Sequence, residues 1–310
     1  MPILNKYRGS LIGLAVGDAM GMPVEFMPPG QFEPVTEYRG GGYFQLKSGY
    51  WTDDTSMALC LAESLIECNG FDAYHQMKKY KRWWSEEAYL SSIDEAFGLG
   101  RTVSRAFSNF EKTNNPFSGP TDEYSAGNGS IMRLTAVPLF YAKDPGLAIK
   151  KSAESSKTTH GVDKAIDACR LLGALIVGAI NGTKKEELLD EHYNPVKSSY
   201  WKENPLVDEI NEISLGSYKE KSPPDIIGTG YVVKTLEAVL WAFHHTDSFK
   251  EGLLKVVNLG DDADTTGAVY GQLAGAYYGE KTIPENWRVE LRYYDMIGNY
   301  ANKLYEKSGW

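Results

Sequence analysis

Two clusters of aspartates and threonines are the residues of this 310-residue chain best suited to chemistry. They are Thr52-Asp53-Asp54-Thr55 and Asp261-Asp262-Ala263-Asp264-Thr265-Thr266. Neighbouring carboxylates repel each other, so they are costly unless water or a cation neutralises them. Both clusters precede helical patterns, and Thr and Asp are good N-cap residues, so helix capping is the simpler alternative. A cap needs only one such side chain, and each cluster has several, so the additional carboxylates favour metal binding.

The type of metal follows from the donors, which are carboxylate and hydroxyl oxygens only. Such ligands suit Mg²⁺ or Mn²⁺. The five histidines form no i, i+4 pair and no Cys/His set has zinc spacing, which disfavours zinc. The second cluster lacks the glycine and distal glutamate of an EF-hand loop. We therefore expect two divalent cations, Mg²⁺ or Mn²⁺, which together would orient a substrate and activate water.

Two further segments suit contact with a substrate. The loop Gly127-Asn128-Gly129-Ser130 precedes an apolar run, and a helix starting directly after Ser130 would offer backbone N–H groups to an anion such as a diphosphate. His160 lies in a Thr/Gly turn between two expected helices, where a turn or capping role is the alternative. Because the loop is distant in sequence from both acidic clusters, we expect Asn128 to bind substrate without affecting the metals.

The elements that must position these residues are helices. Apolar residues recur on one face of residues 55–67, 164–180 and 231–243, whereas alternating strand patterns are scarce. Glycine- and proline-rich stretches separate the helical segments. The polar segment 183–225 is expected to be a peripheral excursion from a single domain spanning residues 1–310. The sequence thus predicts an all-α fold.

Two stripes of glycine at intervals of four residues stand out within the expected helices. They are Gly9, Gly13, Gly17 and Gly21, and Gly267, Gly271, Gly275 and Gly279. A glycine inside a helix costs about 1 kcal/mol relative to alanine. Spacing of four places these glycines along one side of a helix. We therefore expect neighbouring helix backbones to approach closely beside the acidic clusters.

Composition limits the partners. The net charge of −9 and the lack of a long basic stretch disfavour binding through nucleic-acid phosphates. The longest apolar stretch, residues 171–180, is too short to span a bilayer. Three cysteines without paired spacing are typical of a reducing compartment. With no signal peptide evident at the start, we expect a cytoplasmic protein that does not bind membranes.

Several motifs resemble those of the ADP-ribosylglycohydrolases, the family that includes dinitrogenase reductase-activating glycohydrolase. The resemblance covers nearly the whole chain, and the two aspartate clusters together are its most specific part. The motifs are Gly13-Leu14-Ala15-Val16-Gly17-Asp18-Ala19-Met20-Gly21-Met22-Pro23-Val24-Glu25, Trp51-Thr52-Asp53-Asp54-Thr55, Ala126-Gly127-Asn128-Gly129-Ser130-Ile131-Met132-Arg133, Thr158-Thr159-His160, Gly260-Asp261-Asp262-Ala263-Asp264-Thr265-Thr266 and Gly275-Ala276-Tyr277-Tyr278-Gly279.

The resemblance implies a compact orthogonal helical domain with a binuclear Mg²⁺ or Mn²⁺ centre. By position, the implied metal ligands are Thr52, Asp53, Asp54, Asp262, Asp264 and Thr265. The implied catalytic residues are Glu25, Asp53, Asp54 and Asp262, and the implied substrate contacts are Gly127, Asn128, Gly129, Ser130 and His160. The sequence departs from some arginine-specific members in having Ser125, rather than an acid, before the Ala-Gly-Asn run. That departure leaves the acceptor and the general acid open.

The function that the resemblance implies is hydrolysis at C1″ of ADP-ribose. The substrate would be an ADP-ribosylated protein, modified on arginine, and the product mono-ADP-ribose. Alternatives are serine-linked ADP-ribose, ADP-ribose on a nucleic-acid base, a two-metal nucleotide phosphohydrolase, and a protein that binds ADP-ribose without turnover. Nucleic acid would be a partner only in the second of these cases. We expect a monomer.

Overall fold

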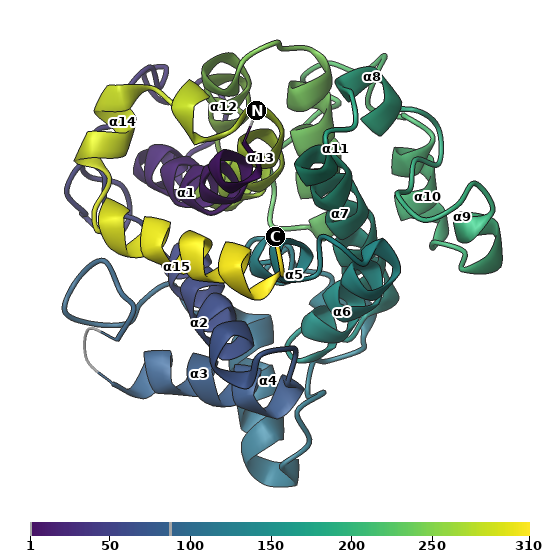
Figure 1. Cartoon of the computed structure of the whole chain (residues 1–310). Coiled ribbons are helices and arrows are strands. Elements are labelled where there is room, and N and C mark those ends of the chain that lie inside the picture. The colour runs from purple at the N-terminus through teal and green to yellow at the C-terminus, as the bar shows by residue number, and fades with distance from the viewer. Residues whose placement is uncertain (1, 87–88) are drawn as a thin grey trace.

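The computed structural model describes residues 2–86 and 89–310, and across them the chain is helical, which confirms the predicted all-α class. β-pairing in this part of the chain is limited to two isolated bridges, Gly41 to Leu46 and Gly127 to Tyr231. The helices, shown in Figure 1, are α1 (Ile3–Gly21), α2 (Asp53–Cys68), α3 (Ala73–Ser85), α4 (Arg101–Thr113), α5 (Ala136–Phe140), α6 (Pro145–Lys157), α7 (Asp163–Asn181), α8 (Lys185–Leu188), α9 (Tyr200–Glu203), α10 (Asp208–Ser214), α11 (Val232–His244), α12 (Phe249–Val257), α13 (Ala263–Tyr278), α14 (Glu285–Glu290) and α15 (Tyr294–Lys307).

The helices expected from periodicity are α2, α7 and α11. Each buries its apolar face in one continuous hydrophobic core. Their ends follow local rules: α2 stops at Asn69 and α7 at Gly182, both of which adopt a positive φ. Asparagine and glycine tolerate that conformation better than other residues do, so they terminate helices readily.

Helices α1 and α13 pack backbone against backbone. A Cβ atom placed on Gly13 would lie 2.4 Å from the carbonyl oxygen of Gly271, and one on Gly17 would lie 2.0 Å from that of Gly267. Gly9 faces Gly275 in the same way. The two helices therefore run antiparallel, side by side at the centre of the upper half of Figure 1. This arrangement confirms the close approach expected from the glycine stripes.

The antiparallel pair decides where the acidic clusters lie. The row of close contacts between the two helices, which we call the glycine ladder, continues to Gly21, where an added Cβ would lie 2.2 Å from the carbonyl oxygen of Ala263. The last turns of α1, with Asp18, thus lie beside the first turn of α13, with Asp264. The start of α2, which carries Asp53 and Asp54, packs against both helices.

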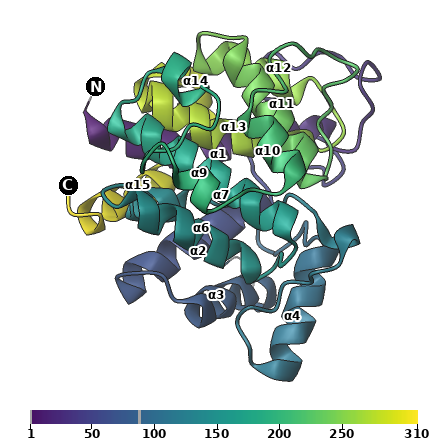
Figure 2. The ribbon, with the colours of Figure 1, turned by 90° about the vertical axis from the view of Figure 1, so that its right-hand side faces the viewer.

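Segment 183–225 contains the short helices α8, α9 and α10, and α10 packs against α7 and α11. Figure 2 shows α9 and α10 on the near side of the molecule, in front of α7. Among the described residues, no helix combines the length and apolar character that crossing a bilayer requires.

One expected helix is not formed. Residues 129–135 adopt turns, and the next helix, α5, begins only at Ala136. The buried guanidinium of Arg133 donates to the carbonyl oxygen of Gly129, and the N–H groups of Ile131 and Met132 both donate to the carbonyl of Asn128. The prediction of a helix directly after Ser130 was therefore wrong, and this loop offers no helix start to an anion.

Candidate active site

Asp18 anchors the first acidic cluster, although the sequence patterns did not single it out. Its carboxylate is fully buried and accepts hydrogen bonds from four donor groups, the backbone N–H and the hydroxyl of Thr52 (both 2.9 Å) and the same groups of Thr55 (3.1 and 2.6 Å). The signal in the sequence that could have singled out Asp18 is its position as a charged residue in a helical segment of otherwise small and apolar residues. Asp18 therefore fixes the conformation with which α2 begins.

The threonines and aspartates at the helix starts do not act as caps. Thr52 is the N-cap residue of α2 and Asp262 that of α13, yet neither side chain bonds to its own helix N–H groups. The Thr52 hydroxyl instead donates to Asp18, and Asp262 accepts from Asn128. Capping, the simpler alternative, thus does not account for these residues.

The carboxylates of the two clusters come together. Oxygens of Asp18, Asp54 and Asp264 lie within 4.8 Å of one another, and so do oxygens of Glu25, Asp262 and Asp264. Asp264 belongs to both groups, an arrangement suited to two neighbouring cations. Asp53, an expected ligand, is in neither group, although it lines the same cavity.

Three carboxylate oxygens in this cluster are buried without any hydrogen-bond partner: Glu25 Oε2, Asp54 Oδ1 and Asp264 Oδ1. Burial, together with the charges of Asp262 and Asp18, raises the pKa of Glu25 to about 8. Burial also raises the pKa values of Asp54 and Asp264 well above their ordinary range. Such crowding is unfavourable unless positive charge balances it. Oxygen-only donors with uncompensated charge fit hard divalent cations.

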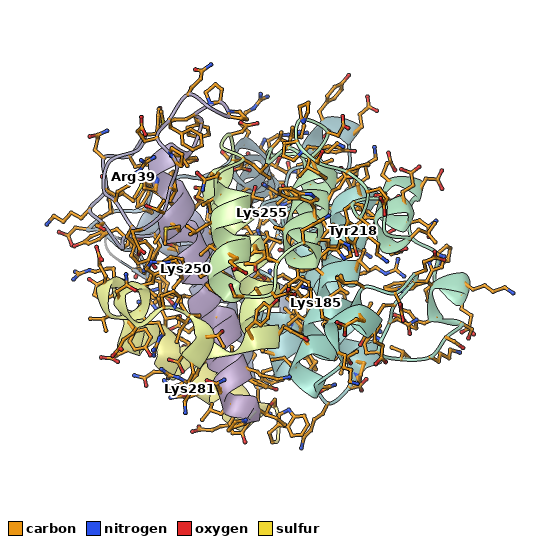
Figure 3. The ribbon with its side chains drawn as sticks, turned by 90° about the horizontal axis from the view of Figure 1, so that it is seen from above. Arg39, Lys185, Tyr218, Lys250, Lys255 and Lys281 are labelled. Atoms are coloured by element: carbon orange, nitrogen blue, oxygen red, sulfur yellow. The ribbon has the colours of Figure 1, made fainter. Side chains whose placement is uncertain are left out.

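The carboxylates open into a cavity of about 210 Å³. Its walls are formed by Glu25, Phe26, Asp53, Asp54, Gly98, Gly100, Arg101, Thr102, Val103, Gly127, Asn128, Gly129, Met132, His160, Asp262, Asp264 and Thr265. Thr52 and Ser130, two predicted site residues, do not line it: Thr52 lies beneath the carboxylates, and Ser130 is buried. Lys250 and Lys255 of α12, on the face viewed in Figure 3, do not line the cavity, whereas Arg101 does.

Asn128 joins the glycine-rich loop to the acidic cluster. Its amide nitrogen donates to Asp262 Oδ2 at 2.6 Å and to the hydroxyl of Thr235 at 2.9 Å, while its backbone N–H donates to the carbonyl of Gly230. Asn128 thus contacts an expected metal ligand, whereas the sequence predicted that it acts independently of the metals. Distance along the chain did not predict this contact because folding brings the two segments together.

His160 reaches the cavity as a neutral hydrogen-bond donor. Arg133 donates to the hydroxyl oxygen of Thr159 at 2.6 Å, and that oxygen lies 2.8 Å from His160 Nδ1. The Thr159 hydroxyl also has one hydrogen to donate, and among the described residues Nδ1 is the acceptor in reach, so we assign that hydrogen to Nδ1 and the imidazole proton to Nε2. Burial and the nearby Arg133 charge lower the pKa of His160 to about 3. Nε2 lies beside Gly127 and Gly129 on the cavity wall.

Ser125, the position that departs from some arginine-specific sequences, lies outside this cavity. Its buried hydroxyl donates to Asp122 at 2.9 Å and accepts from Arg105 at 2.9 Å. Ser125 therefore belongs to a network that joins Arg105 of α4 to Asp122, and not to the group of cavity carboxylates.

Comparisons with known proteins agree with this geometry. The family model of ADP-ribosylglycohydrolase matches residues 1–310. The chain is 37% identical to ADP-ribosylarginine hydrolase Tri1 of Serratia proteamaculans, over 97% of this chain and 79% of that protein. It is 32% identical to ADP-ribosyl-[dinitrogen reductase] glycohydrolase of Rhodospirillum rubrum, over 93% and 90% of the two chains.

Among solved structures, the chain matches one described as an ADP-ribosylglycohydrolase-related protein complex. The TM-score is 0.86, the sequence identity is 40%, and the match covers 99% of each chain. The helical arrangement described above is thus that of a known structure, over essentially the whole length.

Proposed function

The chain belongs to the ADP-ribosylglycohydrolase family, and we propose that it is an enzyme of the arginine-directed kind, releasing mono-ADP-ribose from modified arginine side chains of proteins. The family match makes it a glycosyl hydrolase. Its similarity to a protein named ADP-ribosylarginine hydrolase, at 37% identity, supports arginine as the acceptor. The observation that carries the proposal is the cluster of uncompensated carboxylates at the base of the cavity.

Two divalent cations, Mg²⁺ or Mn²⁺, are proposed to bind this cluster. The proposed ligands are Thr52, Asp53, Asp54, Asp262, Asp264 and Thr265, with Glu25 at the edge of the group. Support comes from the partnerless oxygens of Glu25, Asp54 and Asp264 and from the two oxygen groups that share Asp264. Bound cations of this kind supply Lewis acidity toward substrate hydroxyls and water.

The side chains have distinct proposed roles. Glu25, Asp53, Asp54 and Asp262 would place negative charge beside C1″ of the ribose, where positive charge develops as the bond to the acceptor breaks. The Nε2–H of His160 and the backbone of Gly127 and Gly129 would hold the unreactive diphosphate part. Binding energy from that part would position the scissile bond over the carboxylates.

The test is product analysis on defined substrates. Peptides that carry ADP-ribose on arginine or on serine are incubated with the protein and Mg²⁺ or Mn²⁺, and with excess EDTA. We expect free ADP-ribose from the arginine peptide, and none after EDTA treatment. Release of AMP would instead identify a phosphohydrolase, and binding of ADP-ribose without any product would identify a non-catalytic binding protein.

Two neighbouring aspartates provide matched variants. Asp264→Asn removes a buried carboxylate from both oxygen groups, so turnover and metal affinity should fall by orders of magnitude. Asp261→Asn changes an exposed side chain outside the cavity and should leave both properties unchanged. Equal effects of the two substitutions would argue against the proposed metal centre.

A further inference from the structure

Four aromatic side chains form a continuous row beside the cavity, which we call the aromatic rim. Phe26 contacts Tyr43 with ring centroids 5.3 Å apart, Tyr43 contacts Phe44 at 5.1 Å, and Phe44 contacts Phe97 at 4.9 Å. Phe26 lines the cavity, and Gly98, which follows Phe97, lines it too. The rim therefore connects two parts of the cavity wall.

The outer half of the rim is open to solvent. Phe26 is 59% exposed and Tyr43 is 72% exposed. Burying an aromatic ring is strongly favourable, and these two rings forgo most of that gain. Scattered single exposed rings are normal, but a contiguous pair at the mouth of a polar cavity is typical of a binding surface.

The backbone holds Phe26 in a strained conformation. Its φ is 64°, a value that bulky residues rarely adopt. The Phe26 N–H donates to the carbonyl of Asp261 at 2.6 Å, and the Asp261 N–H donates to the carbonyl of Met27 at 2.8 Å. These two hydrogen bonds hold the backbone of Phe26 and Met27 against Asp261, the neighbour of the cavity residue Asp262. Strain that the surroundings enforce in this way is characteristic of functional positions.

The neighbours of the rim define which ligand it suits. Glu25, whose Oε2 is buried without a partner, directly precedes Phe26, and Asp53 lies against Gly98. Aromatic faces beside carboxylates attract cations, and the planar guanidinium of arginine stacks on such rings. The hydrogen-bond donors on the cavity wall, by contrast, which include Arg101, His160 and the Gly127–Gly129 loop, suit an anion.

We propose that the aromatic rim is the acceptor subsite: Phe26 and Tyr43 stack on the guanidinium of the ADP-ribosylated arginine and thereby select arginine over serine. This inference rests on the proposed function, since it assigns the arginine half of that substrate. A serine acceptor offers neither a cation nor a flat surface to these rings. Free ADP-ribose lacks the group altogether, so its binding does not depend on the rim.

The experiment compares Phe26→Ala and Tyr43→Ala with the parent. The probes are a peptide mono-ADP-ribosylated on arginine, used for KM and kcat, and free ADP-ribose, used as a competitive inhibitor. We expect KM to rise roughly three- to thirtyfold in each variant, the range expected for loss of a cation–π contact. Inhibition by ADP-ribose should stay unchanged, and Phe26→Tyr, which keeps a ring, should retain the parent KM.

Trp84→Ala is the matched control. Trp84 is a 44% exposed aromatic residue on α3 that does not line the cavity, so its removal should leave KM unchanged. Tyr43→Ala keeps the test valid if Phe26→Ala disturbs the strained loop, because most of the Tyr43 side chain is in solvent.

The outcomes separate this inference from the proposed function. If the parent hydrolyses the arginine peptide but neither variant changes KM, the rim is not the acceptor subsite and the proposed function stands. If ADP-ribose inhibition weakens as much as KM rises, the rim binds the ADP-ribose part, which also overturns the inference. If the parent releases nothing from the arginine peptide, the proposed function itself fails.

Discussion

Replacing Gly13 by alanine tests the central packing of the molecule. The new Cβ atom would lie 2.4 Å from the carbonyl oxygen of Gly271, which is 1.0 Å short of the 3.4 Å at which ordinary contact begins. The obstructing atom belongs to the backbone of α13, so no side-chain rotation can relieve the clash. Either the two helices separate or α1 shifts along its axis.

Two opposing effects set the magnitude. Alanine favours a helix over glycine by about 1 kcal/mol. Overpacking of a tight core costs about 1–3 kcal/mol, and a backbone clash lies at the upper end or beyond. We therefore expect Gly13→Ala to lower the free energy of unfolding by about 1–2 kcal/mol, which corresponds to a Tm lower by roughly 2–6 °C.

Thermal and urea unfolding of the metal-free protein measure this change. Gly146→Ala is the matched control, since Gly146 lies in the first turn of α6 and its Cβ would meet only Asp144 Oδ1, at 3.7 Å. That variant should be as stable as the parent or slightly more stable. Because α1 and α13 also set the spacing of Asp18 and Asp264, Gly13→Ala should weaken binding of Mn²⁺ as well. If Gly13→Ala melts like Gly146→Ala, the glycine ladder does not hold these helices together.

Three further predictions concern the site. Asn128→Ala removes the hydrogen bond to Asp262, so calorimetry should show weaker binding of both Mn²⁺ and ADP-ribose; unaltered Mn²⁺ affinity would contradict the coupling. ¹⁵N NMR should show His160 neutral, with its proton on Nε2, from pH 5 to 8, because its pKa is lowered to about 3; Thr159→Val should mix the tautomers, and a charged imidazole at pH 6 in the parent would refute the assignment. In EDTA, Tm should fall as the pH rises from 5 to 8. The pKa of Glu25 is about 8 in the folded state and near 4.3 in the unfolded state, so the folded protein binds more protons than the unfolded protein across this window and is destabilised as they are lost. Saturating Mg²⁺ or Mn²⁺ should remove most of this slope, and equal slopes with and without metal would contradict the proposed charge compensation.

The sequence alone predicted three of the helices and the crowding of carboxylates that indicates a cation. Helices α2, α7 and α11 were predictable because burial of one helix face leaves a local 3.6-residue pattern. The glycine stripes predicted close backbone approach because nothing else compensates for glycine in a helix. Adjacent carboxylates indicated a cation because their repulsion exists whatever the fold. These signals are local, so they survive in the linear sequence.

Only the tertiary structure decided which residues meet. Asp18 anchors the loop 34 residues further along the chain, and Asn128 reaches Asp262 across 134 residues. The turns after Ser130 stand where a helix was expected, and the buried Arg133 in them donates to the carbonyl of Gly129 and also to the hydroxyl of Tyr80, 53 residues away. A hydrogen bond between distant segments depends on the packing that brings them together, and no local pattern encodes it. The antiparallel α1–α13 pair supplies that packing, and with it the shared position of the two acidic clusters.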